Sequence, residues 1–215
     1  MSSSSPDPVA RYFDRHAEDF DTIYEDRKGR LRSLRDRLSR GTVVQRLTFV
    51  DELARERTPG RVLDVGCGSG RFGVRLAEHG WEAVGLDFAA EMVVLAQEHA
   101  AAAGVADRCT FLQADFLAWD AEGAFDLGLA IGLFDYVAHP QPLLDKLVQV
   151  TGGRVVASFP KRWHILVPLR WVRLRASNCP VYFFTRRRVE ALAADAGLKV
   201  KVVSFHRDYL LVGEA

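Results

Sequence analysis

Cysteine is scarce in this chain, and its scarcity excludes two kinds of protein. Only three cysteines, Cys67, Cys109 and Cys179, occur in 215 residues. Their number is odd and their spacing is wide, so the sequence predicts neither a disulfide framework nor a metal site built on paired cysteines. We therefore expect a site without a metal ion.

Long apolar runs are missing as well. No stretch of about 18 consecutive apolar residues occurs, which argues against a transmembrane helix. The first eight residues, MSSSSPDP, are polar where a secretory signal would be apolar. A cytoplasmic location is the expectation that follows.

An excess of charge of one sign is also absent over the whole chain. The formal net charge is +1, so the molecule as a whole favours neither nucleic acid nor a membrane as its partner. The hydrophobic fraction of 48% suits a globular protein, and a chain of this length can form one domain with a sizeable core.

What is present is an alternation of strands and helices. Residues 1–8 predict a disordered tail because they contain nothing to bury, and the apolar spacing of residues 9–57 indicates helices. Strands are expected at 61–65, 82–87, 109–113, 125–131, 154–159, 198–205 and 208–214. Helices are expected at 70–79, 89–103, 140–150 and 185–196.

This alternation predicts an α/β fold with a mostly parallel, doubly wound sheet. The last two strands are separated by only a few residues, which is too short for a parallel crossover, so they should pair antiparallel. Residues 160–184 do not fit the alternation and are interpreted as an insertion.

The segment VLDVGCGSGRFG, residues 62–73, follows the first expected strand. Gly68, Gly70 and Gly73 have the spacing of loops that bind a pyrophosphate, but Gly73 falls inside the expected helix. Asp64 lies directly before the loop, where a carboxylate would repel phosphate and would suit an ammonium group. The loop therefore predicts a cationic ligand.

Two further acids end the next strands and should lie on the same edge of the sheet, where ligands of open α/β folds bind. Asp87 can accept hydrogen bonds from both hydroxyls of a ribose, and Asp115 from an adenine amine. Phe88, Met92 and Phe116 offer apolar faces to a purine. A ligand with an ammonium group, a ribose and an adenine, and without phosphate, is S-adenosylmethionine.

Four segments together resemble the motifs of the class I S-adenosylmethionine-dependent methyltransferases: VLDVGCGSG, VGLDFAAEM, FLQADF and FDLGLAIGLFDYV. The resemblance covers residues 60–159, and more loosely 185–215. It implies a seven-stranded sheet of order 3-2-1-4-5-7-6 with an antiparallel last strand. It also implies one domain over 9–215, in which 9–57 form a helical lid and 160–184 lie on the acceptor side.

The same resemblance implies a set of cofactor contacts. The main part of the set is Asp64, Gly66, Cys67, Gly68, Asp87, Phe88, Met92, Asp115, Phe116, Ile131 and Gly132. The lid would add Tyr12 or Tyr24.

The methyl acceptor is predicted from two segments. A hydroxyl or amine acceptor profits from a general base, whereas a carboxylate needs none. His139 is the first candidate for such a base, and Tyr136 and Asp135 lie near it in the sequence.

Residues 160–188 hold eight lysines and arginines, no acid, and several aromatic residues. They predict a small aromatic or anionic acceptor, or else contact with an anionic membrane surface. The expected acceptor contacts are His164, Arg170, Arg173 and Tyr182. The layout is loosely similar to the magnesium-protoporphyrin O-methyltransferases, which esterify a propionate on a flat anionic ring.

Methyl transfer to an oxygen or nitrogen of a small molecule is thus the leading interpretation, and three alternatives remain. A nucleic-acid methyltransferase would explain the basic segments, but the [ND]-P-P-[YFW] signature is absent where LFDYV stands. A nicotinamide-dependent oxidoreductase would explain the glycine spacing, but not Asp64. A non-catalytic protein could bind S-adenosylmethionine with an acceptor pocket that does no chemistry.

Overall fold

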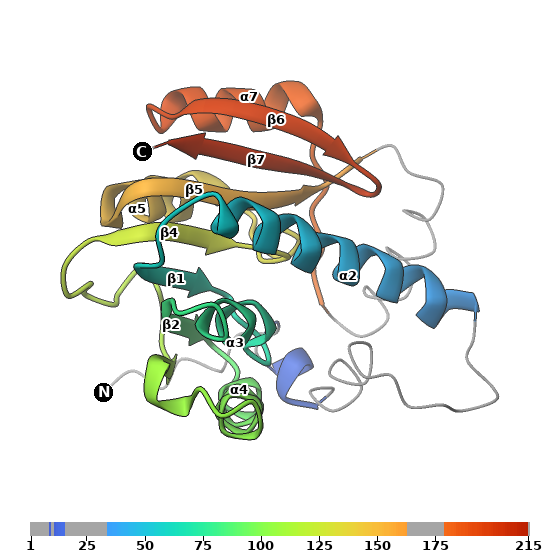
Figure 1. Cartoon of the computed structure of the whole chain (residues 1–215). Helices are drawn as coiled ribbons and strands as arrows, with labels where there is room; N and C mark the ends of the chain where they lie inside the picture. Colours follow the sequence, from blue (N-terminus) through green and yellow to red (C-terminus); the bar gives the residue numbers. More distant parts are fainter. Residues whose placement is uncertain (1–8, 10, 16–33, 163–178, 215) are drawn as a thin grey trace, which may run out of the picture.

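The computed structural model describes residues 9, 11–15, 34–162 and 179–214 (Figure 1). The predicted tail at 1–8 and the central parts of the predicted lid and insertion, 16–33 and 163–178, lie outside these residues. The described chain forms a seven-stranded sheet in the order β3-β2-β1-β4-β5-β7-β6. β7 pairs antiparallel with both of its neighbours, while the other pairings are parallel, so the predicted fold class and strand order are confirmed.

The elements follow one another closely along the chain. The strands are β1 Arg61–Val65, β2 Glu82–Asp87, β3 Cys109–Gln113, β4 Phe125–Ala130, β5 Thr151–Pro160, β6 Lys199–Phe205 and β7 Asp208–Glu214. The helices are α2 Leu34–Arg55, α3 Arg71–Ala77, α4 Ala90–Ala102, η1 Ala106–Arg108, α5 Pro140–Val150 and α7 Arg186–Asp195, and residues 11–15 are also helical. β5 is longer than predicted because α5 passes into it without a loop.

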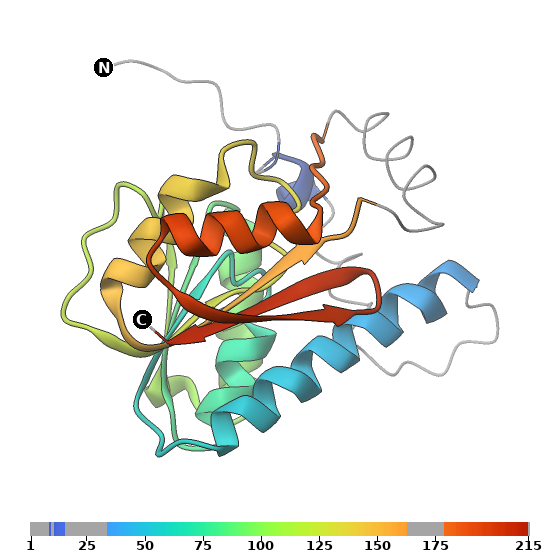
Figure 2. The same ribbon diagram turned by 90° about the horizontal axis from the view of Figure 1, so that it is seen from above.

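Helices cover both faces of the sheet (Figures 1 and 2). On one face, Val50 and Ala54 of α2 and Leu76 of α3 pack on the strands. On the other face, Leu144 of α5 and Leu192 of α7 belong to a larger cluster. Since adjacent residues of a strand point to opposite faces, nearly continuous apolar strands such as β4 and β5 contribute to both cores.

The glycine segment positions the loop that follows β1. Gly70 precedes α3 with a φ of 72°, a conformation that favours glycine. Gly73 lies inside α3, where a Cβ atom would be 3.3 Å from Phe111 Cε1. The third glycine therefore allows α3 to pack closely on the sheet.

No described helix is both long and apolar enough to span a membrane. In the part of the chain that the structure describes, no group of three or more His, Cys, Asp or Glu side chains could hold a metal ion.

Candidate functional site

The loop after β1 turns sharply over the carboxyl edge of the sheet. The backbone N–H groups of Gly66 and Cys67 both donate to Leu86 O, at 2.8 and 3.0 Å, which ties the loop to β2. Gly66 has a φ of 69° and Gly68 a φ of 52°. A Cβ atom at Gly66 would lie 2.9 Å from Leu133 Cδ1, whereas one at Gly68 would meet nothing within 4 Å. The loop thus leaves open space beside Gly68, where a ligand can approach the backbone.

Asp64 is the unusual acid of this edge. Its side chain is buried, with 1% of the residue exposed, and its Oδ2 atom has no hydrogen-bond partner in the described structure. Burial, and after it the charge of Asp87, raises the pKa of Asp64 from 3.8 to about 7. A buried carboxylate with an unsatisfied oxygen is costly without a cation, so this position fits an ammonium group.

Asp87 lies at the end of β2 and organises the loop. Its Oδ2 accepts a hydrogen bond from Gly68 N at 2.8 Å, and its Oδ1 accepts one from Ala89 N at 3.0 Å. Burial raises the pKa of Asp87, and the neighbouring N–H groups oppose that rise. Each carboxylate oxygen can accept a further bond, so Asp87 fits a pair of ribose hydroxyls.

The other predicted adenine contacts lie in different surroundings. Phe88 is 48% exposed at the sheet edge, and Met92 is buried beside Ala89. Asp115 is exposed, and its Oδ1 accepts from Leu117 N at 2.9 Å. Phe116 instead packs in the larger core, with Lys146 Nζ 5.2 Å from its ring centre. Phe88 and Asp115 are therefore exposed at the edge, Met92 is buried beside it, and Phe116 packs in the core.

Cys67 packs among the apolar residues between α3, α4 and the sheet, and its surroundings do not suit a nucleophile. Burial, and after it the charges of Asp64 and Asp87, raises the pKa of its thiol. A thiol held in its protonated form is a poor nucleophile, so Cys67 fits the loop by its small size. Its contact with the cofactor stays a prediction.

The end of β4 is fixed by polar groups that sequence patterns did not indicate. Gly132, with a φ of 82°, donates its N–H to the buried Ser158 Oγ at 2.7 Å. A Cβ atom at Gly132 would lie 3.3 Å from Arg46 Nη1. Arg46 itself, from α2, forms an ion pair with the buried Asp208 at 2.6 Å. Next to Gly132, Ile131 is buried against the α2 face.

The helical residues 11–15 link the two sides of the site. Phe13 packs against Ala89 and Met92 near the end of β2, and its ring lies 5.1 Å from the ring of Tyr136 after β4. Tyr12 packs against Cys179. Residues 11–15 thus contact both the β2 side and the β4 side of the carboxyl edge, and the role of residues 9–57 as a lid stays a prediction. Phe13, rather than Tyr12, reaches Met92.

The predicted acceptor residues fall into two groups. Asp135 is buried, and its carbonyl oxygen accepts from Tyr182 N at 2.8 Å, so the loop after β4 meets the segment that precedes α7. Tyr136 contacts Phe13 and Tyr182 packs on the larger core. His139 is exposed at the start of α5 and makes no capping hydrogen bond in the described structure. Of the three proposed bases, Asp135 and Tyr136 therefore adjoin the segment before α7.

Cations gather beyond β5. Phe184 N donates to Pro160 O at 2.8 Å and Arg162 N to Phe184 O at 2.9 Å, which joins the end of β5 to the chain entering α7. Arg162, Arg187 and Arg188 are exposed there. Since acids end β1, β2 and β3, the carboxyl edge is acidic at one end and basic at the other.

Several predicted contacts lie outside the described residues. They are Tyr24, His164, Arg170 and Arg173, together with most of the basic segment predicted to touch an acceptor or a membrane surface. These assignments stay predictions.

Comparisons with known proteins agree with this geometry. A family profile described as a methyltransferase domain matches residues 62–152. The tRNA 5-carboxymethoxyuridine methyltransferase of Escherichia coli (strain K12) is 34% identical over 145 residues, which cover 65% of this chain and 52% of that protein. The ubiquinone biosynthesis O-methyltransferase of Bordetella avium (strain 197N) is 29% identical over 99 residues, covering 46% and 41%. The chain thus spans about half the length, or less, of these curated relatives.

A solved structure extends the likeness to the whole chain. The magnesium protoporphyrin IX methyltransferase from Synechocystis PCC 6803, with bound SAM, superposes with a TM-score of 0.77. The match covers 100% of this chain and 99% of that one at 19% identity. At this identity the likeness concerns the fold alone.

Proposed function

We propose that this chain, which by its domain and its fold belongs to the class I S-adenosylmethionine-dependent methyltransferases, transfers a methyl group to a small acceptor. The observation that carries the proposal is the buried, unsatisfied carboxylate of Asp64 beside the open space at Gly68. A pyrophosphate would be repelled there, whereas the amine of a methionine group is stabilised. The match to a methyltransferase domain also argues against a nicotinamide-dependent oxidoreductase.

S-adenosylmethionine supplies an activated methyl group on a sulfonium. Asp64 would bind its amine, Asp87 its ribose hydroxyls and Asp115 its adenine amine. Arg46 Nη1 lies near Gly132, at the methionine end, and would bind the carboxylate. Phe88 would then cover one face of the adenine.

The chain's own task in such a reaction is positioning. Transfer from a sulfonium is an in-line displacement, so the rate depends on alignment and on the exclusion of water. Phe13 and Tyr136 meet across the edge between the proposed cofactor and acceptor sides. They would exclude water from the transferred methyl group.

The acceptor is proposed to be a small aromatic or anionic molecule that accepts the methyl group on oxygen or nitrogen. The exposed Arg162, Arg187 and Arg188 support an anionic group, since cations at the rim attract and orient anions. Should the acceptor atom belong to a carboxylate, no general base is required. Otherwise Asp135, Tyr136 or His139 would supply it.

A nucleic-acid acceptor is the second candidate. It is favoured by the relative named for a modified tRNA uridine and by the same exposed arginines. A small acceptor is preferred because Asp64, Asp87 and Asp115 make the β1–β3 part of the edge acidic, whereas a long polyanion requires an extended basic surface.

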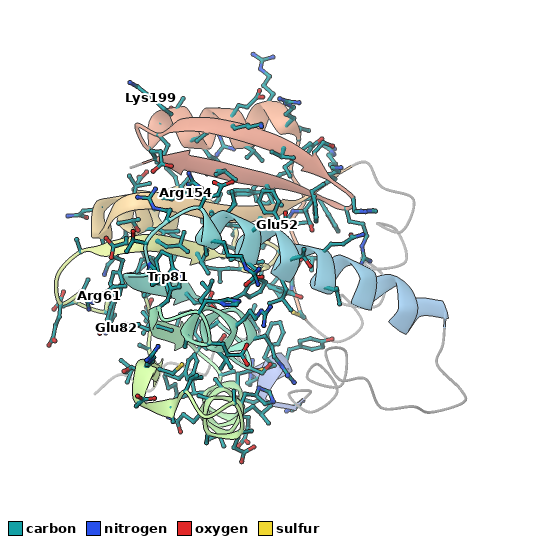
Figure 3. All side chains as sticks on the ribbon, viewed as in Figure 1. Glu52, Arg61, Trp81, Glu82, Arg154 and Lys199 are labelled. Carbon is teal, nitrogen blue, oxygen red and sulfur yellow. The ribbon has the colours of Figure 1, made fainter. Side chains whose placement is uncertain are left out.

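Transfer of a labelled methyl group from S-adenosylmethionine tests both candidates, with small acidic aromatic compounds and total tRNA as acceptors. We expect labelling of a small acid, and an acceptor KM that rises about tenfold in the double variant Arg187→Ala, Arg188→Ala. The matched control is Lys199→Ala, Lys201→Ala, which removes two exposed charges from β6; Figure 3 shows Lys199 at the opposite end of the sheet. Labelling of tRNA alone would contradict the small-molecule proposal.

Cofactor binding should depend on pH. Since the pKa of Asp64 is about 7 in the cofactor-free protein, a cation must displace a proton at lower pH. The affinity for S-adenosylhomocysteine should therefore be constant above about pH 8 and fall, by up to about tenfold per pH unit, below pH 7. Calorimetry in two buffers of different ionisation enthalpy would count the released proton. A pH-independent affinity between pH 6 and 8 would contradict the role of Asp64.

A further inference from the structure

Asp208 is a charged residue buried at the first position of β7. It is 1% exposed and lies opposite Pro160, the last residue of β5. Arg46 Nε and Nη2 both contact Asp208 Oδ2, at 2.9 and 2.6 Å. A buried ion pair gives little net stability, so the burial of Asp208 with Arg46 at this end of the hairpin points to a purpose beyond stability.

The pair gives the guanidinium of Arg46 a defined direction. Nε and Nη2 contact Asp208, and Nη1 of the same guanidinium lies 3.3 Å from the position of a Cβ atom on Gly132. Gly132 is itself held by the bond from its N–H to Ser158 Oγ. The arginine and the end of β4 are thus oriented toward one place by buried partners.

The hairpin of β6 and β7 also holds the helix that carries Arg46. Phe49 of α2 and Phe205 of β6 have ring centres 5.7 Å apart. Lys161 Nζ donates to His206 O at 2.6 Å, which places another cation beside the hairpin turn. Without the carboxylate of Asp208, the guanidinium of Arg46 would lose a buried anionic partner that fixes its direction.

We propose that Asp208 is a positioning residue that holds Arg46 toward the carboxylate of the cofactor's methionine group. The C-terminal hairpin therefore takes part in cofactor recognition, although it lies outside the matched methyltransferase domain. This inference rests on the proposed function, because it requires a ligand with an amino-acid end.

Two ligands that differ only at this end provide the test. S-adenosylhomocysteine has the amino-acid group, and 5′-methylthioadenosine lacks it but keeps the adenosine and the sulfur. Asp208→Asn should raise the Kd for S-adenosylhomocysteine about ten- to hundredfold and leave the Kd for 5′-methylthioadenosine unchanged. Arg46→Ala should do the same, and combining the two should add little, because Asp208 acts through Arg46.

Glu214→Gln is the matched control. Glu214 is also a β7 acid in an ion pair, with Arg154 at 2.8 Å, but it lies at the other end of the strand. The variant should change neither affinity. Equal losses for both ligands in Asp208→Asn, or no loss for either, would overturn the inference while the proposed function stands. A wild-type protein that does not bind S-adenosylhomocysteine would overturn both.

Discussion

Replacing Asp64 with asparagine is expected to weaken cofactor binding severely and, at the same time, to stabilise the cofactor-free protein. The two effects have one cause: without a bound cation, the ionised carboxylate is buried with an unsatisfied oxygen, which destabilises the folded protein. Removing its charge removes the partner of the proposed amine, so the Kd for S-adenosylhomocysteine should rise about 100-fold or more.

The gain in stability follows from the raised pKa. Keeping Asp64 ionised, with a pKa of about 7 in place of 3.8, costs about 1.4 kcal/mol per pH unit, or on the order of 4 kcal/mol above pH 7. A buried asparagine amide also lacks partners, so we expect about 2 kcal/mol of net stabilisation.

The pH dependence gives this effect a signature. The folded protein binds the proton of Asp64 more tightly than the unfolded chain, so wild-type stability falls as the pH rises from about 4 to 7. The gain in free energy of unfolding of Asp64→Asn over the wild type should be complete above pH 7 and vanish near pH 4. Denaturant unfolding at several pH values measures it.

Asp115→Asn is the control, because Asp115 follows β3 at the same edge of the sheet but is exposed. It should leave the free energy of unfolding unchanged and weaken the cofactor only modestly. If Asp64→Asn bound S-adenosylhomocysteine as the wild type does, the assignment of the amine to Asp64 would be wrong.

The parts of the molecule that could be predicted from sequence are those governed by local patterns. Apolar runs of five to seven residues bounded by glycine or proline predicted the strands, and short connections predicted the hairpin of β6 and β7. Asp64 and Asp87 could be placed together because parallel strands end at one edge. The backbone bond from Gly68 N to Asp87 agrees with that placement.

The parts that could not be predicted depend on distant contacts. Arg46 and Asp208 are 162 residues apart, and nothing near either residue in the sequence marks it as paired. Ser158 offered a weak signal, as a polar residue within the apolar run VVASFP. Phe116 also depends on distant contacts: it is adjacent to Asp115 but packs in the larger core, and its contact with the cofactor stays a prediction.

Replacing Asp87 with alanine should weaken every ligand that contains the ribose. The change removes the proposed acceptor of the two hydroxyls, and it also leaves Gly68 N and Ala89 N without their carboxylate partner. We expect the Kd for S-adenosylhomocysteine to rise about 100-fold or more, with a loss of about 1–2 kcal/mol in stability. Calorimetry and denaturant unfolding measure the two effects.

Comparison with Asp64→Asn makes this prediction specific, because the two acids should affect the binding of different ligands. 5′-Methylthioadenosine keeps the ribose and lacks the amine, so Asp87→Ala should weaken it as strongly as S-adenosylhomocysteine, while Asp64→Asn should spare it. Asp107→Ala removes an exposed acid of η1 at the amino end of β3 and should change neither affinity. If 5′-methylthioadenosine bound Asp87→Ala as it binds the wild type, the assignment of the ribose to Asp87 would be wrong. Asp87 would then only hold the loop through its bonds from Gly68 N and Ala89 N.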